Sequence, residues 1–138
     1  KRLAEECRGA RILLADDDPV NQEITSELLG RLGLVVDIAS NGLEAVQQVQ
    51  SAPYDLVLMD MMMPVCDGLE ATRAIRALPD LHDLPIVAMT ANAFVEDRDA
   101  CRAAGMNDQV AKPVEIEAFY ATVLRCLQVA RDRPVTAR

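Results

Sequence analysis

The chain has little of what several common functional sites require. Its 138 residues include one histidine and four widely separated cysteines, Cys7, Cys66, Cys101 and Cys126, with no Cys-x-x-Cys pair. Zinc sites draw on clustered cysteine and histidine ligands, and structural disulfides belong to oxidising compartments. The sequence therefore argues against a zinc site and against a disulfide framework, and it favours a reducing, cytoplasmic location.

Long apolar runs and phosphate-binding glycine loops are missing as well. No uninterrupted apolar stretch approaches the roughly 20 residues that span a bilayer, and the first residues do not resemble a secretory signal. We therefore expect a soluble domain that makes no direct membrane contact. The chain also contains no Walker-type loop and no protein-kinase signature, so nothing in it is recognisable as a source of phosphoryl groups.

Basic residues are fewer than acidic ones. The chain has 14 lysine and arginine residues against 22 acidic ones, a net charge of −8, which repels phosphate backbones and argues against direct nucleic-acid binding. Its length suits one domain with a substantial core. Because the first residue is Lys1, we expect a piece of a longer protein: a linker at 1–10, a folded domain at 11–130 and a tail at 131–138.

What the sequence does contain is a fivefold alternation of strand and helix patterns. Short apolar segments predict strands, the last of them weak, at residues 12–15, 34–39, 56–59, 86–89 and 108–111. A helical pattern follows each of them. Such alternation predicts an α/β fold, a five-stranded parallel sheet covered by helices on both faces. We expect the doubly wound, flavodoxin-like (βα)5 arrangement with strand order 2-1-3-4-5.

The apolar residues of the helical segments predict which helix faces are buried. Pro19 suits the start of the first helix and Gly33 its end, and Asn41 can cap the second. We expect one buried stripe on each of the first two helices, formed by Val20, Ile24, Leu28 and Leu32 and by Leu43, Val46 and Val49. The last helix has the clearest periodicity, with Ile116, Phe119, Tyr120, Val123, Leu124 and Leu127.

Polar residues follow four of the predicted strands. Asp16 and Asp17 come after the first strand, Asp60 after the third, Thr90 after the fourth and Lys112 after the fifth. Carboxyl ends of parallel strands share one edge of the sheet, and in the expected order the first and third strands are neighbours about 4.8 Å apart. We therefore expect these five side chains to surround a single crevice.

Three carboxylates in one crevice favour a bound cation. Two of them about 5 Å apart, at an effective dielectric near 20, repel by roughly 3 kcal/mol. Magnesium relieves that repulsion and leaves positions open for phosphate oxygens. Asp60 could then attack phosphorus, with Mg2+ and Lys112 neutralising the phosphoryl oxygens and Thr90 donating a hydrogen bond. The product would be an aspartyl phosphate, and its donor would come from outside the domain.

From Ala10 to about Ala130 the sequence resembles the response-regulator receiver domains of bacterial two-component signalling. The match rests on Asp16-Asp17, Asp60, Met63-Pro64, Asp67-Gly68, Thr90-Ala91 and Lys112-Pro113. The resemblance implies that Asp60 is the phosphoacceptor, that Asp17 and Asp60 bind magnesium directly, and that Asp16 does so largely through water. It also implies that the main-chain carbonyl of Met62 is a ligand. Such a domain catalyses only its own phosphorylation and dephosphorylation and is not a stand-alone enzyme.

Two further segments resemble the receivers of hybrid sensor histidine kinases: Pro19-Val20-Asn21-Gln22 and Gly105-Met106-Asn107-Asp108. This resemblance implies a phosphorelay in which a kinase histidine gives its phosphoryl group to Asp60, which can pass it to a histidine phosphotransfer domain. Residues 1–10 would be the tether from upstream modules, including a membrane-bound sensor. Gln109 departs from the family, because receivers often carry an aromatic residue there that is coupled to the threonine.

The sequence leaves three alternatives to a receiver within a hybrid kinase. The first is a stand-alone response regulator. The second is a haloacid-dehalogenase-type phosphatase, in which Asp16-x-Asp18-x-Val20 would supply the nucleophile and the general acid. The third is an unphosphorylated pseudo-receiver that serves as a docking module; its usual mark is the loss of an acidic residue or of the lysine, and all of them are present here.

Overall fold

The computed structural model describes residues 9–61, 67–78, 81, 84–90, 95–111 and 115–131. Its centre is a parallel sheet with strand order β2-β1-β3-β4-β5. The strands are β1 (Arg11–Ala15), β2 (Val35–Ala39), β3 (Leu56–Asp60), β4 (Ile86–Thr90) and β5 (Asp108–Ala111). The predicted flavodoxin-like fold and its strand order are confirmed.

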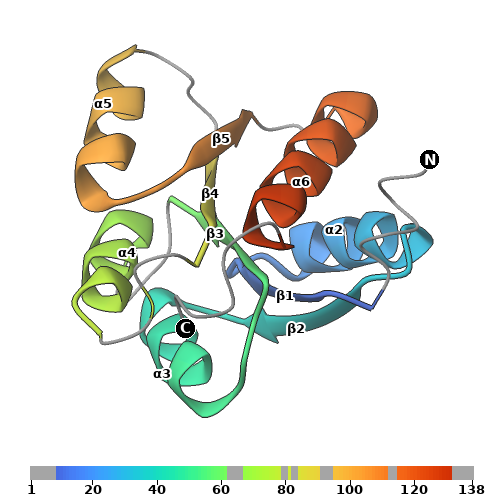
Figure 1. Cartoon of the computed structure of the whole chain (residues 1–138), viewed down its shortest axis with the longest axis horizontal. Coiled ribbons are helices and arrows are strands. Elements are labelled where there is room, and N and C mark those ends of the chain that lie inside the picture. Colours follow the sequence, from blue (N-terminus) through green and yellow to red (C-terminus); the bar gives the residue numbers. More distant parts are fainter. Residues whose placement is uncertain are drawn as a thin grey trace.

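Helices cover both faces of the sheet. They are α2 (Pro19–Arg31), α3 (Gly42–Ser51), α4 (Gly68–Arg76), α5 (Val95–Ala104) and α6 (Ile116–Arg131). Figure 1 shows α2 and α6 on one side and α3, α4 and α5 on the other. No helix in the described ranges combines the length and the apolar character needed to cross a bilayer.

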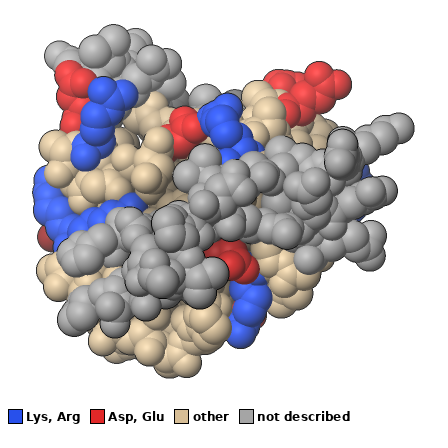
Figure 2. Space-filling view, in the orientation of Figure 1, with Lys and Arg blue, Asp and Glu red and all other residues tan. Residues whose placement is uncertain are grey.

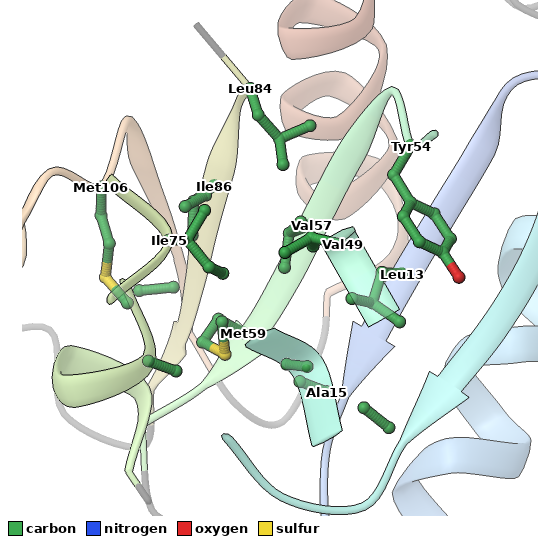
Figure 3. Packing of buried hydrophobic residues seen from close by; sticks show 14 of the residues in the cluster. Leu13, Ala15, Val49, Tyr54, Val57, Met59, Ile75, Leu84, Ile86 and Met106 are labelled. Atoms are coloured by element: carbon green, nitrogen blue, oxygen red, sulfur yellow. The ribbon is translucent and has the colours of Figure 1, made fainter. Parts of the chain in front are cut away.

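Alternating side chains of the strands fill two separate cores. Leu13, Val57 and Ile86 point toward α3, α4 and α5, where Figure 3 shows them packed together. Their sequence neighbours point the other way and meet Phe119 of α6, which is fully buried. All five residues of β3 and all five of β4 are buried, as expected of central strands with helices on both faces.

The predicted stripe of α2 is wrong in its first half. Val20 and Ile24 are 62% and 52% exposed, whereas the buried residues are Thr25, Leu28 and Leu29. An α-helix has 3.6 residues per turn, so residues spaced by four advance about 40° at each step. Val20 and Leu28 therefore lie on different faces of the helix, and the sheet covers only the later one.

The same drift explains an error in α3, and α6 has a smaller error at its first residue. In α3 the expected stripe had a strict spacing of three, and Leu43 is 49% exposed while Ala45 and Val49 are buried. In α6 the first residue, Ile116, is exposed, whereas Phe119 and Val123 are buried as expected. A run of equal spacings thus predicts a helix but misplaces its buried face toward one end.

Arg76 ties together three segments near the amino ends of β4 and β5. Its guanidinium donates to the carbonyl oxygens of Gly105 (2.9 Å) and Leu81 (2.8 Å) and to the side-chain oxygen of Asn107 (2.8 Å). That same oxygen accepts from the backbone N–H of Ile86 at 2.8 Å. Part of the Gly105-Met106-Asn107-Asp108 segment therefore has a structural role: it fixes where β5 begins.

The described surface mixes charges of both signs. Figure 2 shows acidic and basic side chains interspersed on one face, without a continuous patch of either sign among the coloured residues. Net charge alone therefore does not single out a site there. Among the described cysteines, Cys101 and Cys126 are buried free thiols.

Candidate functional site

Three acidic side chains meet at the carboxyl edge of the sheet. Asp16, Asp17 and Asp60 each offer a carboxylate oxygen, and these oxygens lie within 4.8 Å of one another. Asp16 is fully buried, Asp60 is almost fully buried and Asp17 is exposed. The cause is the pairing of β1 with β3, in which Ala15 lies opposite Met59. The residues that follow them, Asp16 and Asp60, therefore lie side by side. The predicted convergence of the three carboxylates is confirmed.

The first turn of α2 holds the acidic segment in place. The Asp16 side chain accepts from the backbone N–H of Asp18 at 2.9 Å, and Asp18 in turn caps the helix by accepting from the N–H of Val20 at 2.9 Å. The Gln22 side-chain amide donates to the Asp16 carbonyl oxygen at 2.5 Å. Sequence reasoning missed this role of Gln22; its place in the first turn after an acidic loop was the available signal.

A close approach of α4 fixes the backbone of Asp60. The N–H of Met61 donates to the Met89 carbonyl at 3.2 Å, and the N–H of Gly68 donates to the Met61 carbonyl at 3.3 Å. A Cβ atom on Gly68 would lie 2.5 Å from the backbone oxygen of Asp60. The glycine is therefore required by contact with backbone, and Asp67 and Glu70 complete a capping box at the same helix end.

Thr90 lies at the end of the next strand. Thr90 is the last residue of β4 and is 6% exposed. Its preceding residue, Met89, pairs with Asp60 of β3. The structure thus places Thr90 one strand away from Asp60 at the same edge. The predicted site residues Lys112 and Met62 lie outside the described residues.

The donor set suits a hard divalent cation. All three side chains contribute carboxylate oxygens, the ligands that Mg2+ and Ca2+ prefer, and no described cysteine or histidine joins them. Two of the three are buried, where like charges repel more strongly than in water. The residues present therefore fit magnesium.

The phosphatase alternative loses its proposed general acid. Asp18 is exposed and its carboxylate is engaged as the N-cap of α2, and it is not one of the three acidic residues that converge. A general acid must reach the atom that it protonates. Asp16 and Asp18 therefore do not form the nucleophile and acid pair which that alternative requires.

Comparisons with known proteins agree with this geometry. Residues 12–124 match the family model for the response regulator receiver domain. The chain is 45% identical over 126 residues to hybrid signal transduction histidine kinase B of Dictyostelium discoideum, with 83% of the chain and 6% of that protein covered. It is 35% identical over 124 residues to the histidine-protein kinase BarA of Escherichia coli, with 89% and 14% covered. The chain therefore spans only a small part of these relatives.

Solved structures give the same result. The receiver domain of a sensor histidine kinase from Pseudomonas aeruginosa, which holds a magnesium ion in its active-site cleft, is 42% identical with a TM-score of 0.81, covering 87% of this chain and 98% of that one. A Saccharomyces cerevisiae receiver domain, co-crystallised with a histidine phosphotransfer protein, is 28% identical with a TM-score of 0.81, covering 88% and 92%. By its sequence match, its fold and its acidic cluster, the chain belongs to the response-regulator receiver family.

Proposed function

We propose that this domain accepts a phosphoryl group on Asp60 from a phosphohistidine. A carboxylate oxygen of Asp60 attacks phosphorus, the new O–P bond forms as the N–P bond breaks, and the electron pair of that bond stays on the imidazole of the donor. The observation that carries the proposal is the meeting of three carboxylates within 4.8 Å at the carboxyl ends of β1 and β3. Asp60 is the last residue of β3, and the residue after it, Met61, is held by backbone hydrogen bonds to Met89 and Gly68.

Magnesium is the proposed cofactor. Asp17 and Asp60 would hold it directly, Asp16 through water, and the carbonyl of Met62 would complete the protein ligands, as the family resemblance implies. When bound, the ion supplies positive charge that offsets the carboxylates and the phosphoryl oxygens. Asp16 has the most rigid setting of the three, because both its side chain and its carbonyl oxygen accept hydrogen bonds from the start of α2.

Thr90 and Lys112 would bind the phosphoryl group itself. The Thr90 hydroxyl can donate to a phosphoryl oxygen from the end of β4, next to the strand that carries Asp60. Lys112 follows β5 directly in the sequence, and its long side chain can bring an ammonium to the same oxygens. These are the roles expected in a site that stabilises a phosphoryl group by charge and position.

The proposed partners are a histidine kinase and a histidine phosphotransfer domain, in the cytoplasm. Support comes from the two histidine kinases named above, one of them a hybrid kinase, and from the yeast receiver that was crystallised with a phosphotransfer protein. The domain would serve one stage of a relay within a hybrid kinase. A stand-alone response regulator is the alternative that flanking sequence would decide.

Labelling with acetyl phosphate tests the proposal. With Mg2+ present, the parent domain should gain one phosphoryl group by intact-mass spectrometry, and Asp60→Asn should gain none, since the amide is a far weaker nucleophile. Asp55→Asn is the matched control, because Asp55 accepts from the backbone N–H of Arg11 at the opposite edge of the sheet. A parent that stays unlabelled, or an Asp60→Asn variant that labels as fast as the parent, would overturn the proposal and leave a docking module.

A second variant tests the role of Lys112. Lys112→Ala should slow labelling without weakening magnesium binding, because the ammonium is proposed to act on the phosphoryl oxygens and not on the ion. Chelation of Mg2+ should stop labelling of the parent. Unchanged labelling of Lys112→Ala would show that this lysine has another role.

A further inference from the structure

Gln109 faces the α5 side of the sheet with its amide against sulfur atoms. Its side-chain N–H donates to the Cys101 thiol at 3.4 Å, and the same thiol lies 3.8 Å from the sulfur of Met61. Cys101 is almost fully buried in α5, and Met61 directly follows Asp60. The amide therefore lies in a mostly apolar pocket close to the segment that carries the proposed phosphoacceptor.

The hydrogen bonds of this amide are poor. A thiol is a weak acceptor, and the Gln109 side-chain oxygen is buried without a hydrogen-bond partner among the described residues. A buried acceptor in that condition destabilises the arrangement that contains it. The Gln109 side-chain amide is therefore poorly hydrogen-bonded in this position, and a better hydrogen-bond partner nearby would attract it.

The register of β4 and β5 supplies such a partner. Ala88 pairs with Gln109 and Thr90 pairs with Ala111, so Thr90 is the diagonal neighbour of Gln109. Side chains alternate along a strand, and Ala88 and Cys101 belong to the same core, which puts Thr90 and Gln109 on one face. Strand spacing and rise place their Cα atoms roughly 8 Å apart, a gap that the two side chains can bridge with one hydrogen bond.

We propose that Gln109 is a positioning residue for the Thr90 hydroxyl. When Asp60 carries a phosphoryl group, the Gln109 N–H leaves the Cys101 thiol and donates to the hydroxyl oxygen of Thr90, while the hydroxyl hydrogen points to a phosphoryl oxygen. A hydroxyl can donate once and accept at the same time, and donating to an anion makes it a better acceptor. The inference rests on the proposed function, since it needs phosphorus on Asp60.

Variants of both residues test this coupling. Gln109→Leu should slow acetyl phosphate labelling about threefold to tenfold, the worth of one ordinary hydrogen bond. Its melting temperature should not fall, because the substitution also removes a buried oxygen without a partner. In a Thr90→Val background, Gln109→Leu should have no further effect on labelling. Equal slowing in both backgrounds would overturn the proposal, as would slowing that merely follows a loss of stability.

Side-chain NMR reports the exchange of partners directly. On adding beryllofluoride with Mg2+, the Gln109 side-chain amide resonances should shift in the parent and much less in Thr90→Val. Gln50 is the control, since its amide donates to the Val46 carbonyl on the exposed side of α3. Labelling of Asp60 with an unmoved Gln109 amide would overturn this inference alone. Absence of labelling on the parent would overturn the proposed function and the inference with it.

Discussion

The two edges of the sheet carry similar acidic residues in opposite electrostatic settings. At the carboxyl edge, three carboxylates gather within 4.8 Å of one another. At the amino edge, the guanidinium of Arg11 (2.7 Å) and the hydroxyl of Tyr54 (2.8 Å) donate to the carboxylate of Asp37, which reaches them from the middle of β2. The same guanidinium also lies over the Tyr54 ring. Among the described residues, the carboxyl edge therefore brings acidic side chains together, whereas the amino edge pairs an acidic side chain with a basic one.

The difference separates the proposed phosphorylation site from a structural ion pair. The Tyr54 hydroxyl, and after it Arg11, hold the pKa of Asp37 below its usual value. Burial, and after it the hydrogen bond to Asp37, raise the pKa of Tyr54 to about 12. Each group at the amino edge thus supports the ordinary charge state of its neighbour. Carboxylates that face one another repel, and this repulsion favours a bound cation.

Glycine substitutions should give the largest difference between the two edges, in both the free energy of unfolding and the labelling of Asp60. Gly68→Ala should lower the free energy of unfolding by about 2–3 kcal/mol, because the new Cβ would meet the backbone of Asp60. It should also slow labelling of Asp60. Gly105→Ala should lower that free energy by about 1–2 kcal/mol through strain at its φ of 111°. It should leave labelling unchanged, because the added Cβ would contact only the flexible side chain of Arg76.

Urea unfolding and acetyl phosphate labelling measure both effects. Gly30→Ala is the control within α2, where nothing lies within 4 Å of the added atom and alanine is the better helix former. It should be as stable as the parent or more so. Normal labelling in Gly68→Ala would mean that the contact between α4 and the Asp60 backbone does not set the geometry of the site.

How far the sequence predicted this molecule depends on what kind of pattern carried the information. Apolar segments such as residues 56–59 predicted the strands, and the acidic residues that follow them predicted the carboxylate cluster, because strand order alone brings such residues together. The exposure of Val20 was not predictable in this way. It depends on which part of α2 the sheet covers, and that is a property of packing.

Long-range polar contacts were equally hidden. Arg76 binds the carbonyl of Gly105, 29 residues away in the sequence, and Arg11 of β1 contacts Asp37 on the neighbouring strand β2. Neither pair has a local signature, since an arginine in a helix or a strand is ordinary. The side-chain contact of Gln109 with Cys101 was hidden for the same reason, although its departure from the family pattern marked the position.

The same Asp→Asn change should have opposite effects at the two edges. Without Mg2+, Asp60→Asn should raise the free energy of unfolding by about 1–2 kcal/mol, because it removes repulsion from Asp16 and Asp17. Asp37→Asn should lower it by up to about 1 kcal/mol, because it weakens a half-exposed ion pair and a hydrogen bond. Saturating Mg2+ should stabilise the parent and Asp37→Asn, and it should leave Asp60→Asn almost unchanged. Equal signs in Mg2+-free buffer would remove the electrostatic distinction between the edges.

The smallest expected effect is the pH dependence that Tyr54 gives to the amino edge. Because the pKa of Asp37 is lower in the folded chain than the ordinary 3.8, the unfolded chain takes up its proton first as the pH falls. The stability from Asp37 is therefore present above about pH 4 and is lost below it. Tyr54→Phe removes the first cause of the shift, so the variant should lose less stability than the parent between about pH 6 and pH 3.

The difference should be below about 1 kcal/mol, since Asp37 is more than a third exposed and solvent weakens the interaction. Urea unfolding at the two pH values measures it. At the alkaline end the sign reverses: the Tyr54 hydroxyl contributes stability below its ordinary pKa of 10.0, and this is lost as the pH rises through about 12. Tyr54→Phe should lack that loss as well. A variant that matches the parent at both ends would mean that the amino edge, unlike the carboxyl edge, is held by packing and not by charge.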